Sequence, residues 1–205
     1  AKNDEGAAGR QRVNAVKAGG DQAPDLEAFC DVYAGGAEAP AFVMPDQDGR
    51  LVSFDDLLSR GPVAVTFHRG FWCPYCRLNT AALADASATA RAFGGQLASI
   101  TPDRRRYSNT MRSEFGADFP VLTDIDNADA VSLNLVIFAG PEMQTLLAER
   151  GRDLPRYQGN DAWMVPIPAT FVVGIDGIIR KRHVDPDYRK RMEIDELLSA
   201  LEDAR

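Results

Sequence analysis

Short apolar runs alternate with longer amphipathic segments along most of the chain. Residues 63–67 (VAVTF) form a nearly all-apolar run of β-forming residues, as expected of a strand buried on both faces. Further strands are predicted at 97–101 and 120–123, and two more within 167–184, joined at Asp176-Gly177. Strands that alternate with helices predict an α/β fold, with a central mixed and mostly parallel sheet flanked by helices.

Helix signals fill the spaces between these strands. A capping box at Ser53 opens a short helix over 54–58, after a hairpin that turns at Asp48-Gly49. An Ala-rich helix follows residue 73 and stops at Gly94-Gly95, and another covers 104–115. The remaining predicted helices lie around 142–150 and near the C-terminus, where one side carries Ile194, Leu197, Leu198 and Leu201. Apart from the helix predicted around 142–150, residues 124–165 show no clear periodicity of apolar residues.

The first 38 residues differ in character from the rest. Residues 1–22 are polar, whereas 25–33 place four apolar side chains at helical spacing and predict one short helix. The stretch GGAEAP, which ends at Pro40, is typical of a linker. We therefore expect an N-terminal arm over 1–38 and one domain over 39–205.

Charge and composition exclude several classes of binding partner. The 205 residues include 23 Lys and Arg against 30 Asp and Glu, a net charge of −7. This acidic balance argues against nucleic acid or an anionic membrane as partner, because phosphate binding needs a basic face. No apolar stretch is long enough to span a membrane, and the first residues lack the apolar core of a signal peptide. A cytoplasmic location is expected.

Two of the three cysteines, Cys73 and Cys76, form a CxxC pair where the buried strand gives way to a helix. The unpaired N–H groups and the dipole of a helix start favour a thiolate, and Pro74 suits the first helical turn. The spacing lets the two sulfurs exchange between dithiol and disulfide. The alternatives are a zinc site, which lacks a second ligand pair, and two inert buried cysteines. No Gly-rich phosphate loop follows a strand, so no cofactor is expected.

Five stretches carry a resemblance to a known family. They are residues 39–46 (APAFVMPD), 49–54 (GRLVSF), 63–76 (VAVTFHRGFWCPYC), 166–177 (PIPATFVVGIDG) and 184–192 (VDPDYRKRM). Together they resemble the thioredoxin-fold redoxins, and within these the peroxiredoxin-like proteins of the alkyl hydroperoxide reductase/thiol-specific antioxidant (AhpC/TSA) family. The resemblance covers residues 39–205 and implies a thioredoxin-like fold and a thiol-based redox enzyme.

Two active-site patterns of these redoxins compete. When the peroxiredoxin pattern Pro-x-x-x-Thr-x-x-Cys is aligned with its cysteine on Cys76, Arg69 occupies the Pro position and Cys73 occupies the Thr position. Pro168 stands where the family's peroxide-binding arginine would be. Losing one such preorganised donor typically costs about 10²–10³ in rate. The thioredoxin pattern fits better: it makes Cys73 the exposed nucleophile, Cys76 the resolving cysteine and Pro168 a cis-proline facing the sulfurs.

The resemblance implies a peroxiredoxin-like enzyme that reduces hydroperoxides through a CxxC dithiol/disulfide cycle. In that cycle a thiolate becomes a sulfenic acid, condenses with its partner, and is recycled by an external thioredoxin- or glutaredoxin-type dithiol. The alternative is a thioredoxin-like oxidoreductase acting on protein or small-molecule disulfides, and a non-catalytic binding protein is a third class. The sequence leaves open whether the chain forms a homodimer.

Other residues near the pair have two interpretations each. Arg69 either substitutes for the missing guanidinium or is a surface residue, and Trp72 forms either an apolar rim for substrate or core packing. Thr170 either offers a hydroxyl to the sulfurs or is an ordinary strand residue. His68 is either an imidazolium that lowers a thiol pKa or a packed, hydrogen-bonded histidine. Cys30 either packs in its helix or acts as a third thiol.

Overall fold

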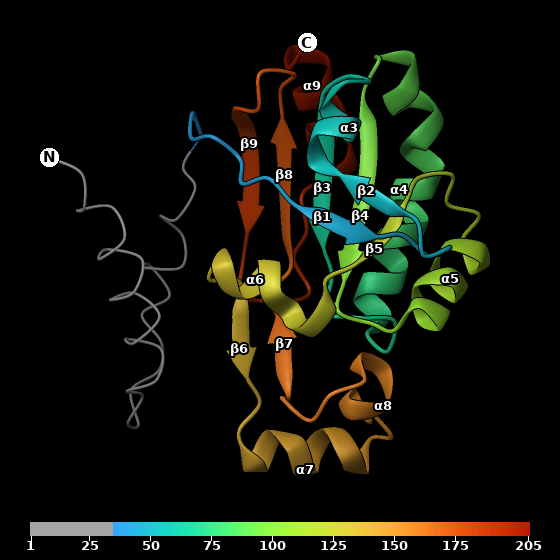
Figure 1. Cartoon of the computed structure of the whole chain (residues 1–205), viewed down its shortest axis with the longest axis vertical. Coiled ribbons are helices and arrows are strands. Elements are labelled where there is room, and N and C mark those ends of the chain that lie inside the picture. Colours follow the sequence, from blue (N-terminus) through green and yellow to red (C-terminus); the bar gives the residue numbers. More distant parts are fainter. Residues whose placement is uncertain (1–34) are drawn as a thin grey trace, which may run out of the picture.

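A five-stranded mixed sheet forms the centre of the molecule (Figure 1). The structure is a computed structural model and describes residues 35–205, so the helix predicted at 25–33 lies outside the described residues. The strand order is β5-β4-β3-β8-β9. Strands β3 (Val63–Phe67), β4 (Gln96–Thr101) and β5 (Val121–Thr123) pair in parallel. Strand β8 (Ala169–Val173) pairs antiparallel with β3, and β9 (Ile179–Val184) pairs antiparallel with β8. The predicted α/β class and mixed sheet are confirmed.

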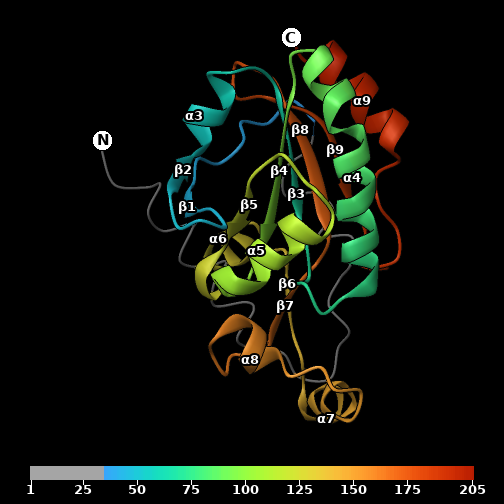
Figure 2. The same cartoon turned by 90° about the vertical axis from the view of Figure 1, so that its right-hand side faces the viewer.

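Helices cover both faces of this sheet. Alternate residues of β3 face opposite ways, so Val65 and Phe67 join one buried cluster and Ala64 joins the other. On the Ala64 side lie α4 (Pro74–Ala92) and α9 (Ile194–Asp203), which pack side by side (Figure 2). The other side carries α3 (Phe54–Leu58), α6 (Ala128–Ser132) and the hairpin of β1 (Val43–Pro45) and β2 (Leu51–Ser53), while α5 (Arg105–Glu114) packs beside β5.

The segment from residue 136 to 166 extends beyond one end of the sheet (Figure 1). Its two strands pair with each other and not with the central sheet. This β6–β7 segment consists of β6 (Val136–Phe138), α7 (Pro141–Glu149), α8 (Leu154–Gln158) and β7 (Met164–Pro166); the 3-10 turn η2 (Ile125–Asn127) and α6 precede it. The sequence predicted only α7 here, because the other elements are too short to show a period.

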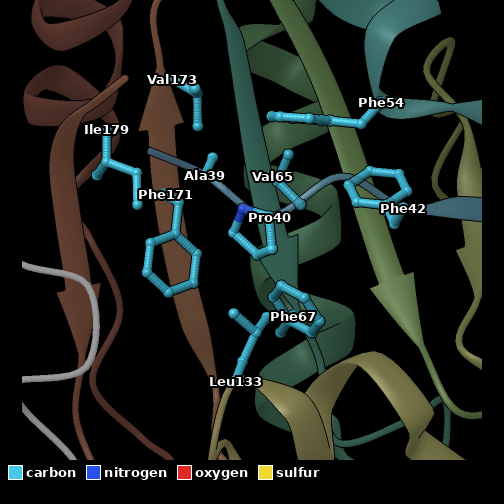
Figure 3. A pocket seen from close by; sticks show the side chains of 10 residues that line it. All are labelled: Ala39, Pro40, Phe42, Phe54, Val65, Phe67, Leu133, Phe171, Val173 and Ile179. Carbon is cyan, nitrogen blue, oxygen red and sulfur yellow. The ribbon is translucent and has the colours of Figure 1, made fainter. Parts of the chain in front are cut away.

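An apolar pocket lies on the face of the sheet opposite α4 and α9 (Figure 3). The aromatic rings of Phe42 and Phe54 lie 5.1 Å apart at one side of it, and those of Phe67 and Phe171 meet edge to face at 6.3 Å. All ten lining side chains are apolar. The pocket therefore holds no group that could act as a nucleophile or proton donor, and the chemistry must be sought elsewhere.

The stretch predicted as a linker is bound to the edge of the sheet. The amide of Gly36 donates to the carbonyl of Ile179, the amide of Ile179 donates to Ala37, and Glu38 forms a bridge with Ile178. The division between arm and domain at residue 39 stays a prediction. Within residues 35–205, no helix has both the length and the apolar character required to cross a bilayer.

Candidate active site

Cys73 and Cys76 lie at the junction of β3 and α4, as predicted. Cys73 is the N-cap residue of α4, with an extended backbone, and Pro74 takes the first helical position. The carbonyl of Cys73 accepts from the amides of Cys76 and Arg77, which closes the first turn. A cap position puts the Cys73 side chain beside the N–H groups at the positive end of the helix dipole.

A tight turn between β3 and α4 sets the position of the dithiol, and the buried carboxylate of Asp103 accepts a hydrogen bond from this turn. The amide of Phe71 donates to Oδ2 of Asp103 over 2.6 Å, and the hydroxyl of Thr101 donates to the same oxygen over 2.7 Å. Burial raises the pKa of this carboxyl to about 6. Gly70 gives the turn its shape with a φ of +134°, and a Cβ there would lie within 3 Å of Trp72 and Asp103.

The environment of Cys73 favours its thiolate. A hydrogen bond from the thiol of Cys76 is the largest influence and, with the helix-start amides of Cys76 and Tyr75 and the charge of Arg69, it lowers the pKa of Cys73 from 9.0 to about 6. Burial opposes this shift but does not outweigh it. The lowered pKa favours the Cys73 thiolate at neutral pH.

Cys76 has the opposite character. Burial raises the pKa of its thiol well above 9.0, and the hydrogen bond to Cys73 and the negative charge there raise it further. Two donors act against this: the amide of Arg69, 3.3 Å from the sulfur, and Nη2 of Arg191, 3.5 Å from it. The two sulfurs thus have opposite pKa shifts, lowered at Cys73 and raised at Cys76.

The prediction that Cys73 is exposed is wrong. Its side chain is only 1% exposed and that of Cys76 is fully buried. Both belong to a buried cluster with Trp72 and Met111, to which the β6–β7 segment contributes Ala139, Leu147, Leu154 and Val165. The β6–β7 segment therefore packs over the end of the sheet where α4 begins and takes part in burying the dithiol.

The guanidinium of Arg69 lies between two aromatic rings. Its central carbon is 4.8 Å from the ring centroid of Trp72 and 4.2 Å from that of Tyr188. Among residues 35–205, no carboxylate forms an ion pair with Arg69. Its charge therefore remains available to the Cys73 thiolate, and the structure brings both Arg69 and Trp72 to the dithiol.

Three other predicted residues have different outcomes. All peptide bonds in residues 35–205 are trans, so the predicted cis bond before Pro168 is wrong: the chain runs extended from β7 into β8, and the trans form is favoured by about 0.5–1 kcal/mol. The Thr170 hydroxyl pairs across the sheet with Thr66 at 3.2 Å, and not with a sulfur. Burial lowers the pKa of His68 to about 3, so its ring is neutral and packs against Ser99.

Sequence reasoning missed Asp103, Tyr188 and Arg191. Asp103 follows β4, and the ends of parallel neighbours such as β3 and β4 meet at one edge of a sheet, so strand order could have pointed to it. Tyr188 and Arg191 lie in the loop between β9 and α9, and Arg191 is 115 positions from Cys76. Both lie within residues 184–192, one of the stretches that carry the family resemblance, but nothing in the sequence places that stretch at the dithiol.

The described residues give no support to the zinc alternative. Within residues 35–205, no group of three or more His, Cys, Asp or Glu side chains is placed to hold a metal ion. The buried ring of His68 forms a hydrogen bond with Ser99.

The pH dependence of thiol alkylation should reveal the two different sulfurs. Since the pKa of Cys73 is lowered to about 6, its thiolate forms as the pH rises through 6, and its alkylation by iodoacetamide should have a midpoint there. Cys76 should remain unreactive at that pH because its pKa is raised. Mass mapping of the labelled cysteines after timed exposure at each pH measures both. A Cys73 midpoint near 8.5 would contradict the assignment.

A helix-start dithiol on a mixed sheet of this order is typical of thiol-redox proteins with a thioredoxin-like fold. Residues 35–182, most of the chain, match the model of the AhpC/TSA family. The chain therefore belongs to the AhpC/TSA family, as a peroxiredoxin-like redoxin.

Individual relatives agree with this assignment. A Mycobacterium tuberculosis protein assigned to the peroxiredoxins is 34% identical over 44% of this chain and 57% of its own length. The thiol-disulfide oxidoreductase ResA of Bacillus subtilis is 29% identical over 44% of this chain and 50% of its own. The crystal structure of peroxidoxin BcpB from M. tuberculosis shares the fold, with a TM-score of 0.65 and 19% identity over 84% of this chain and 99% of the other. The chain spans about half the length of these two curated relatives.

Proposed function

We propose that this protein is a thiol peroxidase that reduces hydroperoxides through Cys73 and Cys76. The Cys73 thiolate attacks one peroxide oxygen, the O–O bond breaks, and the departing oxygen takes a proton and leaves as an alcohol or water. The sulfenic acid of Cys73 then condenses with Cys76. An external dithiol of the thioredoxin or glutaredoxin type reduces the disulfide and completes the cycle.

The observation that carries this proposal is that Cys73 has a lowered pKa although it is buried. The pKa of Cys73 is about 6, yet the residue is 1% exposed and belongs to a cluster that includes the β6–β7 segment. A small hydroperoxide needs only a narrow opening to reach such a sulfur. A protein disulfide must align with the attacking thiolate, which would require the covering side chains to move aside.

One feature supports a second candidate function, which is thiol–disulfide exchange. The CxxC spacing is sufficient for thiol–disulfide exchange, and the relative ResA is named for that activity. Small-molecule disulfides could reach Cys73 as hydroperoxides do, so this alternative predicts exchange with a small disulfide and no fast reaction with peroxide.

Stopped-flow oxidation of the reduced protein separates the two functions. Trp72 lies beside Cys73 and should report the reaction through its fluorescence. We expect hydrogen peroxide to oxidise the protein faster than it oxidises a free thiol at the same pH, and we expect insulin disulfides to react slowly. Oxidation no faster than that of a free thiol, with fast reaction of a small disulfide, would select the alternative.

A further inference from the structure

The loop between β9 and α9 (residues 185–193) reaches the dithiol from a distant part of the chain. Two ion pairs form within the loop, Asp185 with Lys190 at 3.0 Å and Asp187 with Arg189 at 2.8 Å, and both basic side chains are exposed to solvent. Two of its other side chains point to the active site: Tyr188 covers the Arg69 guanidinium, and Arg191 contacts Cys76. The loop is thus a structural part of the site.

Arg191 is held in place by its own loop. Its Nη1 donates to the carbonyls of Tyr188 and Lys190, which leaves Nη2 directed at the Cys76 sulfur, 3.5 Å away. Within residues 35–205, Arg191 forms no ion pair with a carboxylate. Its side chain is half-buried, so its charge is only partly screened by solvent.

The second step of the proposed cycle places a demand on Cys76. To attack the sulfenic acid of Cys73, Cys76 must give up its proton at a fully buried position. Burial disfavours the thiolate, and a fixed guanidinium beside the sulfur favours it. The charge of Arg69 is directed to Cys73, and only its amide reaches Cys76. Arg191 supplies the full positive charge on the Cys76 side.

We propose that Arg191 is a catalytic residue of the resolving step, whose guanidinium stabilises the Cys76 thiolate as it attacks Cys73. This inference rests on the proposed function for its place in the cycle. The Cys76 sulfur forms a bond to the Cys73 sulfur, and the S–O bond of the sulfenic acid breaks. The departing hydroxide takes the proton that Cys76 released and leaves as water. The hydroperoxide has already accepted the two electrons, so this step needs no further oxidant.

Arg191→Met tests the proposal, because it keeps an unbranched apolar stem and removes the guanidinium and its charge. Stopped-flow oxidation should show an unchanged first phase, in which peroxide oxidises Cys73. The second phase, disulfide formation, should be slower by about tenfold or more. The sulfenic acid should accumulate and be trapped by dimedone at Cys73, as mapped by mass spectrometry. Arg191→Lys, which restores the charge, should recover part of the rate.

Arg189→Met is the matched control. It removes a guanidinium from the same loop, but one that pairs with Asp187 and does not contact a sulfur. Its second phase should equal that of the wild type. The proposal is overturned if Arg191→Met resolves within twofold of the wild-type rate, or if Arg189→Met is as slow as Arg191→Met.

A second readout needs no peroxide. In a Cys73→Ser background, Arg191→Met should slow alkylation of Cys76 at a fixed alkaline pH by about tenfold, since less thiolate is present. If the wild type reacts with peroxide no faster than a free thiol, the proposed function fails, while this alkylation result decides separately whether Arg191 stabilises the thiolate. Equal alkylation rates would overturn the inference.

Discussion

Cys73→Ser should reduce peroxide turnover by at least about 10³-fold. The hydroxyl of serine is far less acidic than a thiol, and burial lowers the pKa of His68 to about 3, which makes this histidine too weak a base to ionise it. The variant therefore loses the thiolate that the helix start favours. Hydrogen peroxide consumption with dithiothreitol as reductant measures the loss. Because serine is nearly isosteric, the unfolding midpoint should change little.

Cys76→Ser provides the matched comparison for that result. It keeps the nucleophile and removes its partner, so a single equivalent of peroxide should still be consumed and the sulfenic acid of Cys73 should persist. If instead Cys76→Ser loses the first oxidation and Cys73→Ser keeps it, the two roles are reversed. If both variants keep full turnover, neither redox proposal stands.

The parts of the site that could be predicted are those that lie together in the sequence. Cys73, Pro74 and Cys76 share one helix start, and an apolar run of five residues precedes the turn that leads to them. Strand, turn and helix cap are local features, so residue pattern and helix electrostatics were enough to predict a cysteine pair at a helix start and a lowered pKa there. The central strands and the long helices are predictable for the same reason.

The parts that could not be predicted depend on long-range contacts. The β6–β7 segment buries the dithiol, but its strands are three residues long and carry no readable period. Arg191 reaches Cys76 from a loop far along the chain. The burial of Cys73 depends in part on side chains of the β6–β7 segment. A pattern in the sequence can show that a sulfur is reactive, but only packing shows what can reach it.

The turn that joins β3 to α4 positions Cys73 and the residues around it. Gly70→Ala tests whether the shape of this turn sets the reactivity of Cys73. At a φ of +134° a Cβ would be strained, and it would lie 2.8 Å from Nε1 of Trp72 and 2.9 Å from Oδ1 of Asp103. Neither neighbour can easily move, since Trp72 is packed in the dithiol cluster and Asp103 is fully buried. We expect a loss of about 2–4 kcal/mol in the free energy of unfolding.

The same substitution should slow the oxidation of Cys73, since displacing Trp72 also displaces the guanidinium of Arg69 that stacks on it. Gly116→Ala is the control: its φ is +64°, and nothing lies within 4 Å of the added carbon. That variant should lose only about 1 kcal/mol and keep the wild-type rate. Urea unfolding and the first stopped-flow phase measure both effects. Equal stability of the two variants would mean that backbone strain alone limits position 70. A normal Cys73 rate in Gly70→Ala would mean that the turn does not set the reactivity of the sulfur.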